Sequence, residues 1–149
     1  MKFQTEKISV SLLEEAKPLL EKHWREIAYF KDIELNPDYY KYLKLQELDS
    51  IKAFICRDDE GLMIGYATFI IQPMLHYKQI LSAIEDILYI HPEQRRIGGF
   101  FIKYCDEQLD KLGVQLVSHH IKLAHDWSRG LERMGYVKTE FNMVKRLHQ

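Results

Sequence analysis

Two arginines and two adjacent glycines stand where an apolar strand pattern gives way to an apolar helix pattern. They are Arg95, Arg96, Gly98 and Gly99, shortly after the run that ends at Ile90. A helix start carries unpaired N–H groups and partial positive charge, and glycine lets a phosphate approach the backbone. Arginine adds several donors that suit phosphate oxygens. The stretch predicts a pyrophosphate cradle; the alternative is a basic turn made flexible by two glycines.

Two carboxylates precede this cradle on the predicted strand. Glu85 or Asp86 can accept the proton that an attacking nucleophile must lose. Side chains alternate between the faces of a regular strand, so only one of the two can face the reacting group. We favour Glu85, because regular alternation places it on the same face as Ile87 and Tyr89. The alternative is that both are charges that face solvent.

Three histidines between residues 119 and 125 offer acid–base or metal chemistry. Imidazole titrates near neutral pH, so His120 and His125 are candidate proton donors or acceptors; the alternative is a surface or hydrogen-bonded histidine. His119 and His120 are adjacent, so they point to opposite faces of a strand, and no cysteine pair joins them. We therefore expect no metal site, although His125 and Asp126 are sound types of ligand.

The elements that position these residues follow from hydrophobic periodicity and turn signals. Ser11 is expected to cap the first helix, with Glu14 completing a capping box. The predicted strands are 3–10, 51–56, 63–71, 83–90 and 114–118, with one or two more in 136–147; the helices begin at Ser11 and Asn36 and span 97–112 and 125–134.

This order of elements predicts an α/β (α+β) fold. The sheet is expected to be mixed and mostly antiparallel, with six to seven strands flanked by helices. No repeat or long linker divides the chain, so we expect a single domain over residues 1–149.

The segment Arg95–Phe100 resembles the acyl-CoA-binding motif of the GNAT N-acetyltransferases, Arg/Gln-x-x-Gly-x-Gly/Ala after a strand ending in Val/Ile-x-Pro. Arg95 and Gly98 match, whereas Phe100 stands at the last position and Gly99 one place early. The resemblance implies that the CoA diphosphate lies on backbone amides from Arg96 through Ile97 to Phe100. It also implies that the pantetheine arm pairs with the strand at Leu88, Tyr89 and Ile90, where backbone N–H groups can stabilise an oxyanion.

A second segment resembles the same family. Leu131–Tyr136 is similar to the motif Tyr-Glu-x-x-Gly-Phe, with Leu131 where a tyrosine is frequent. That tyrosine commonly protonates the CoA thiolate, so the resemblance implies that another group takes this role, that acid catalysis is weak, or that activity is lost. Two early segments, HWREIA and LNPDYYKY, are similar to those of small acetyltransferase-like proteins encoded by bacteriophages.

Three functions compete. The resemblance implies an N-acetyltransferase that uses acetyl-CoA as cosubstrate on an amine of a small molecule or a protein. The second is a catalytically inactive binding protein of this fold, which binds CoA or another protein such as a host factor; Phe100 and Leu131 favour it. The third is a different anionic ligand, such as a nucleotide, at Arg95 and Arg96. We favour the first, and expect Trp24, Tyr39, Tyr40 and Tyr42 to line the acceptor pocket or pack in the core.

Composition and charge restrict the partners. The net charge is −1 with both signs interspersed, so we expect neither nucleic acid nor an anionic membrane as partner. The N-terminus has no apolar signal-peptide core, and no apolar run approaches the roughly 20 residues of a membrane span. Two cysteines form no disulfide framework, so a cytoplasmic location is expected. An exposed final strand would favour a homodimer.

Overall fold

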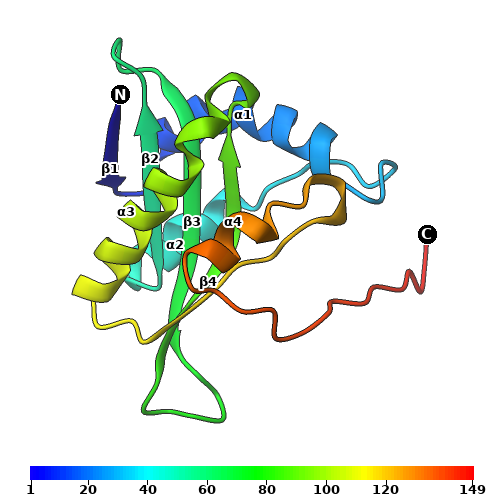
Figure 1. Cartoon of the computed structure of the whole chain (residues 1–149). Helices are drawn as coiled ribbons and strands as arrows, with labels where there is room; N and C mark the ends of the chain where they lie inside the picture. The colour runs from blue at the N-terminus through cyan, green and yellow to red at the C-terminus, as the bar shows by residue number, and fades with distance from the viewer.

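A five-stranded sheet forms the centre of the computed structural model, which describes residues 1–149 (Figure 1). The strands lie in the order β1-β2-β3-β4-β5, and the first four are antiparallel to their neighbours. The last strand pairs parallel with β4, so the predicted mixed, mostly antiparallel sheet is confirmed. The strands are β1 (Lys2–Glu6), β2 (Ile51–Arg57), β3 (Met63–Pro73), β4 (Leu81–Ile90) and β5 (Leu116–Ser118).

The predicted number of six to seven strands is wrong. The expected final strands within 136–147 do not form, and residues 137–149 make no backbone–backbone hydrogen bond. A strand needs a neighbouring backbone to satisfy its N–H and C=O groups, and this segment has none within the chain. It runs away from the sheet as the orange and red tail in Figure 1.

Helices cover both faces of the sheet. Helices α1 (Val10–Ile27) and α2 (Tyr39–Glu47) lie behind it in Figure 1, and α3 (Gly98–Lys111) lies in front. Successive side chains of β2 and β3 point to opposite faces of the sheet and belong to two separate cores. On the α3 side they pack with Phe101, Cys105 and Leu109, and on the α1 side with Leu12 and Leu19. None of the helices combines the length and apolar character needed to cross a bilayer.

Three helix starts differ from the predicted ones. Helix α2 begins at Tyr39 and is capped by Asp38, not by Asn36. Helix α1 is capped by Ser9 instead of Ser11: the Ser9 backbone is extended and its Oγ accepts a hydrogen bond from the Leu12 amide at 3.1 Å. A 3₁₀ turn (Leu123–His125) precedes the short helix α4 (Ser128–Arg133), which starts later than expected. A second 3₁₀ turn (Pro92–Ile97) leads into α3.

Strands β4 and β5 separate along their length. They pair only where Ser82 to Ile84 face Leu116 to Ser118. Beyond this point β4 continues from Glu85 to Ile90 without a strand partner on that side, while its other edge stays paired with β3. The two strands are therefore splayed, and β4 leaves a backbone edge open in the middle of the molecule.

Candidate active site

A cavity of about 420 Å³ occupies the gap between the splayed strands. One wall is the free edge of β4 from Glu85 to Ile90, and the turn into α3 adds Arg95, Gly98 and Gly99. Helix α1 contributes His23, Glu26 and Ile27. The opposite wall comes from the segment after β5: His120, Lys122, His125, Trp127, Gly130 and Met134. Residues far apart in the sequence thus meet around one elongated space.

The start of α3 is open at this cavity. Gly98 and Gly99 are its first residues, and neither has a positive φ. A Cβ on Gly98 would lie 3.7 Å from Ile90 Cδ1, an ordinary contact, and a Cβ on Gly99 would meet nothing within 4 Å. No side chain caps this helix, since the residue before it is Ile97. Neither backbone conformation nor packing requires these glycines, so the space they leave suits a ligand on the helix N–H groups.

Arg95 is fixed at the rim of the cavity. Its Nη2 donates to Glu26 Oε1 at 2.6 Å, its Nε donates to the Ile90 carbonyl at 3.2 Å, and its guanidinium lies 5.8 Å from the centre of the Tyr89 ring. These contacts hold the cation between α1 and the end of β4. A phosphate bound at the start of α3 would therefore meet a guanidinium that is already held in position.

Six of the nine predicted cofactor-binding residues line the cavity: Leu88, Tyr89, Ile90, Arg95, Gly98 and Gly99. The side chains of the other three point elsewhere. Arg96 is exposed, Ile97 packs against the core on the α3 side, and Phe100 is 71% exposed. Phe100 therefore leaves the cavity open, although it stands where the family motif has a small residue.

The face predicted for Glu85 is wrong, because β4 carries a β-bulge. Thr68 pairs with Ile87 and Phe69 pairs with Glu85, which leaves Asp86 as an extra residue without a partner on β3. The bulge breaks the alternation of side chains. Asp86 consequently shares the α1 face with Ile87, and its Oδ2 accepts hydrogen bonds from Thr68 Oγ1 at 3.0 Å and from the Tyr42 hydroxyl.

Glu85 instead turns toward α3 and forms a buried pair with His119. His119 Nδ1 is hydrogen-bonded to Glu85 Oε2, and the two side chains are 2% and 6% exposed. The imidazole packs edge-on against Trp127 at 5.4 Å and Tyr136 at 5.0 Å between ring centres. The pair ties the segment after β5 to β4 at the point where the two strands separate. Sequence reasoning treated the two residues separately and missed this contact.

His23 is a cavity residue that sequence reasoning also missed. Its Nδ1 lies 2.9 Å from the Tyr66 hydroxyl, and its ring stacks on Tyr89 with 4.9 Å between centres. Burial lowers the pKa of His23 to about 4, because the charged imidazolium loses its hydration. The spacing of His23 and Glu26, three apart on a helix that faces the sheet, was the signal that could have indicated it.

His125 and His120 lie on the wall opposite β4. His125 Nδ1 is 3.7 Å from Glu26 Oε1, and His120 lines the same cavity while its neighbour His119 is buried beside Glu85. Leu131, which stands where the family has a tyrosine, is buried. No three His, Cys, Asp or Glu side chains are grouped as metal ligands.

Solved acetyltransferase structures share this architecture, although no protein-family model matches the sequence and no curated protein is similar to it. Ribosomal-protein-alanine N-acetyltransferase from Brucella melitensis biovar Abortus 2308 superposes with a TM-score of 0.71 at 16% identity, covering 99% of this chain and 100% of that one. Glucosamine-6-phosphate N-acetyltransferase from Arabidopsis thaliana gives 0.68 at 10% identity, with coverage of 99% and 100%. An aminoglycoside N-acetyltransferase in complex with CoA gives 0.68 at 14% identity, with the same coverage. The chain therefore has the fold of the GNAT N-acetyltransferases.

Proposed function

We propose that the protein is an N-acetyltransferase that moves an acetyl group from acetyl-CoA directly to an amine acceptor. One observation carries the proposal: a single cavity joins an open helix start, an unpaired strand edge and a carboxylate. The structural neighbours support it, since their names state transfer to a ribosomal-protein alanine, an aminoglycoside and glucosamine-6-phosphate.

The donor site follows from the chemistry of the lining. A diphosphate suits the N–H groups at Gly98 and Gly99 together with Arg95. The amides of a pantetheine arm suit the free N–H and C=O groups of β4 from Leu88 to Ile90, because an unpaired strand edge accepts an extended partner. These residues would hold acetyl-CoA, which supplies an activated acetyl thioester.

Proton transfer is assigned to two side chains on opposite walls. Transfer forms an N–C bond to the acceptor and breaks the C–S bond to CoA, while the nitrogen loses a proton and the sulfur gains one. Asp86 is the base, since its Oδ1 accepts no hydrogen bond from the protein and it lines the cavity. His125 takes the acid role that the family tyrosine would fill at Leu131.

The catalytically inactive alternative rested on two departures from the family motifs. Phe100 lies outside the cavity, so it does not close the donor site. His120 and His125 offer protons on the wall opposite β4, so Leu131 does not leave the site without an acid. A nucleotide remains the second ligand to test at Arg95, because a diphosphate group is common to both.

We also propose a cytoplasmic homodimer. Cys56 and Cys105 are free, buried thiols, as suits a reducing compartment. Exposed apolar residues of the C-terminal segment, with Phe141 at 95% exposure, and the unpaired outer edge of β5 support pairing between two copies. The acceptor is a small molecule or a protein amine in this proposal.

Acetyl transfer itself is the test. The protein is incubated with acetyl-CoA and a panel of amines, with release of free CoA thiol and the mass of the product as readouts. We expect an acetylated amine and one CoA per product. Asp86→Asn should lower the rate of transfer by about 10²- to 10⁴-fold, whereas Asp110→Asn, which changes an exposed carboxylate of α3, is the matched control and should not. Thiol release without an acetylated amine would contradict the proposal.

A further inference from the structure

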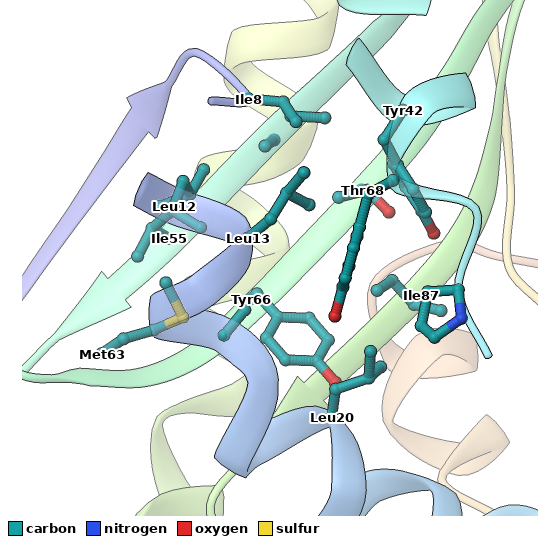
Figure 2. A pocket seen from close by; sticks show the side chains of 14 residues that line it. Ile8, Leu12, Leu13, Leu20, Tyr42, Ile55, Met63, Tyr66, Thr68 and Ile87 are labelled. Carbon is teal, nitrogen blue, oxygen red and sulfur yellow. The ribbon is translucent and has the colours of Figure 1, made fainter. Parts of the chain in front are cut away.

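A second, smaller hollow lies on the opposite side of β4 from the α3 layer. It has a volume of about 50 Å³ and lies between α1, α2 and the sheet, and 12 of its 14 lining residues are apolar (Figure 2). Leu12 and Met63 lie on one side of the view, and Tyr42, Thr68 and Ile87 on the other. Tyr39 and Tyr42, which the sequence offered as acceptor-pocket or core residues, both line it.

The hollow adjoins the large cavity at one residue, Ile87, and Asp86 lines the large cavity only. Tyr42 and Thr68 line the hollow and donate hydrogen bonds to Asp86 Oδ2. Asp86 Oδ1 accepts nothing from the protein. A cation beside Asp86 would therefore lie in the large cavity, next to the Tyr42 and Thr68 side chains that border the apolar hollow.

We infer that this hollow is the acceptor subsite and that it selects primary amines carrying a short aliphatic group. The ammonium group pairs with Asp86, and the aliphatic group fills the recess among Leu12, Leu20, Ile55 and Met63. A water-sized probe needs about 10–15 Å³, so the volume suits about three to five non-hydrogen atoms. The inference rests on the proposed function for the reaction, but its binding part is measured without turnover.

The polar groups of the hollow explain why a hydroxylated acceptor is excluded. Of its four hydroxyl groups, those of Tyr42 and Thr68 are bonded to Asp86, and that of Tyr66 is bonded to His23; the fourth is on Tyr39. An aminosugar would bury its own hydroxyls here without partners, and unpaired buried hydroxyls are strongly unfavourable. Aminoglycosides, the acceptors named for three of the structural neighbours, therefore suit this hollow poorly.

Calorimetric titration of the CoA-saturated protein with n-alkylamines of two to eight carbons, and with glucosamine, tests the inference. Affinity should rise about threefold to fourfold per added methylene up to about five carbons and then level off. Glucosamine should bind more weakly than butylamine. Equal binding of glucosamine, or no dependence on chain length, would overturn the inference.

Variants that fill the hollow provide a second test of the inference. Ala16→Leu on α1 places a larger side chain in the recess and should abolish the dependence on chain length while leaving acetyl-CoA affinity unchanged. Glu21→Leu, at an exposed position of the same helix, is the matched control and should keep the dependence. If Ala16→Leu does not fold, Ala53→Val on β2 fills the recess from the sheet side. An unchanged dependence in a folded filled variant would contradict the inference.

The acceptor subsite and the acetyltransferase function can fail independently. Alkylamines that bind with the expected dependence but are never acetylated would support the subsite and contradict the acetyltransferase function. Acetylation of glucosamine and alkylamines alike, without dependence on chain length, would support the function and contradict the subsite.

Discussion

Asp86 is the residue on which the proposed chemistry depends. Asp86 lines the cavity and its Oδ1 accepts no hydrogen bond from the protein, whereas Glu85 is held by His119 on the other side of the strand. Asp86→Asn should lower kcat by about 10²- to 10⁴-fold, the usual contribution of a general base, with little change in acetyl-CoA affinity. Steady-state kinetics and calorimetric titration of the same variant check both parts.

Glu85→Gln is the matched comparison on the same strand. It weakens the charge-assisted pair with His119, so we expect a loss of about 1.5–3 kcal/mol in the free energy of unfolding. Its kcat should fall far less than that of Asp86→Asn. The reverse order of the two kcat values would return the base role to Glu85.

His23 makes stability depend on pH. Its folded pKa of about 4 lies below the ordinary value of 6.5, so between these values the unfolded chain binds a proton that the folded chain does not. Stability is full above pH 6.5 and falls as the pH drops toward 4, by about 2 to 3 kcal/mol from this residue at pH 4.5. Urea unfolding at pH 7.5 and 4.5 measures the change, and His23→Gln should reduce it. An equally steep loss in the variant would contradict the assignment.

The sequence alone could not decide which face of the strand each of the two neighbouring carboxylates occupies. Glu85 and Asp86 were singled out by residue type and position, and their faces were assigned by regular alternation. The bulge at Asp86 reverses that assignment, and an extra residue on one strand is defined only by its register with the partner. His23 was missed for a related reason, since its contacts with Tyr66 and Tyr89 come from distant strands.

At the scale of elements, the proposed donor site depends on the start of α3. Gly99→Ala adds a Cβ that meets nothing within 4 Å in the free protein, and alanine favours a helix over glycine by up to about 1 kcal/mol. We expect the variant to be as stable as the wild type or more stable, yet to bind acetyl-CoA about tenfold more weakly or worse, since the Cβ occupies phosphate space.

Thermal unfolding and calorimetric titration of Gly99→Ala separate these two effects. Phe100→Ala changes the next residue of the same helix, whose side chain is exposed and outside the cavity, so its acetyl-CoA affinity should match the wild type. Unaltered affinity in Gly99→Ala would remove the helix start from the binding site.

Local signals predicted the elements better than their ends. The strands that became β2, β3 and β4 and the helix that became α3 were expected from periodicity, because each buries one regular face. The cap of α1 was placed at Ser11, since two serines stand near the helix start and only the extended backbone at Ser9 distinguishes them. The segment 136–147 was expected to form strands from its sequence pattern, but a sequence pattern does not supply the neighbouring strand with which to pair.

At the scale of the whole molecule, the C-terminal segment is the part of the fold without internal support. Phe141, Met143 and Leu147 are largely exposed, and the segment is tied to the rest of the chain by Arg146, through Asp32 and the Phe30 ring, and by an exposed ion pair between Lys138 and Glu132. We expect a dimer in which this segment pairs with a second copy. Removal of residues 138–149 should convert it to a monomer while retaining acetyl-CoA binding.

Light scattering after size-exclusion chromatography, over a hundredfold range of protein concentration, checks the state of both forms. Phe141→Ser is a milder variant that should weaken the dimer without shortening the chain. A full-length chain that stays monomeric at the highest concentration, or a truncated chain that stays dimeric, would contradict this expectation.

The central claim is that the splayed cavity binds acetyl-CoA, and calorimetric titration of the purified protein with acetyl-CoA tests it most directly, with ADP as the comparison ligand. The account predicts saturable binding of one acetyl-CoA per chain, tighter than ADP because the pantetheine arm adds its contacts along β4, together with thermal stabilisation by the ligand. Absence of both heat and stabilisation would contradict the account, and ADP binding as tight as acetyl-CoA would favour a nucleotide ligand instead.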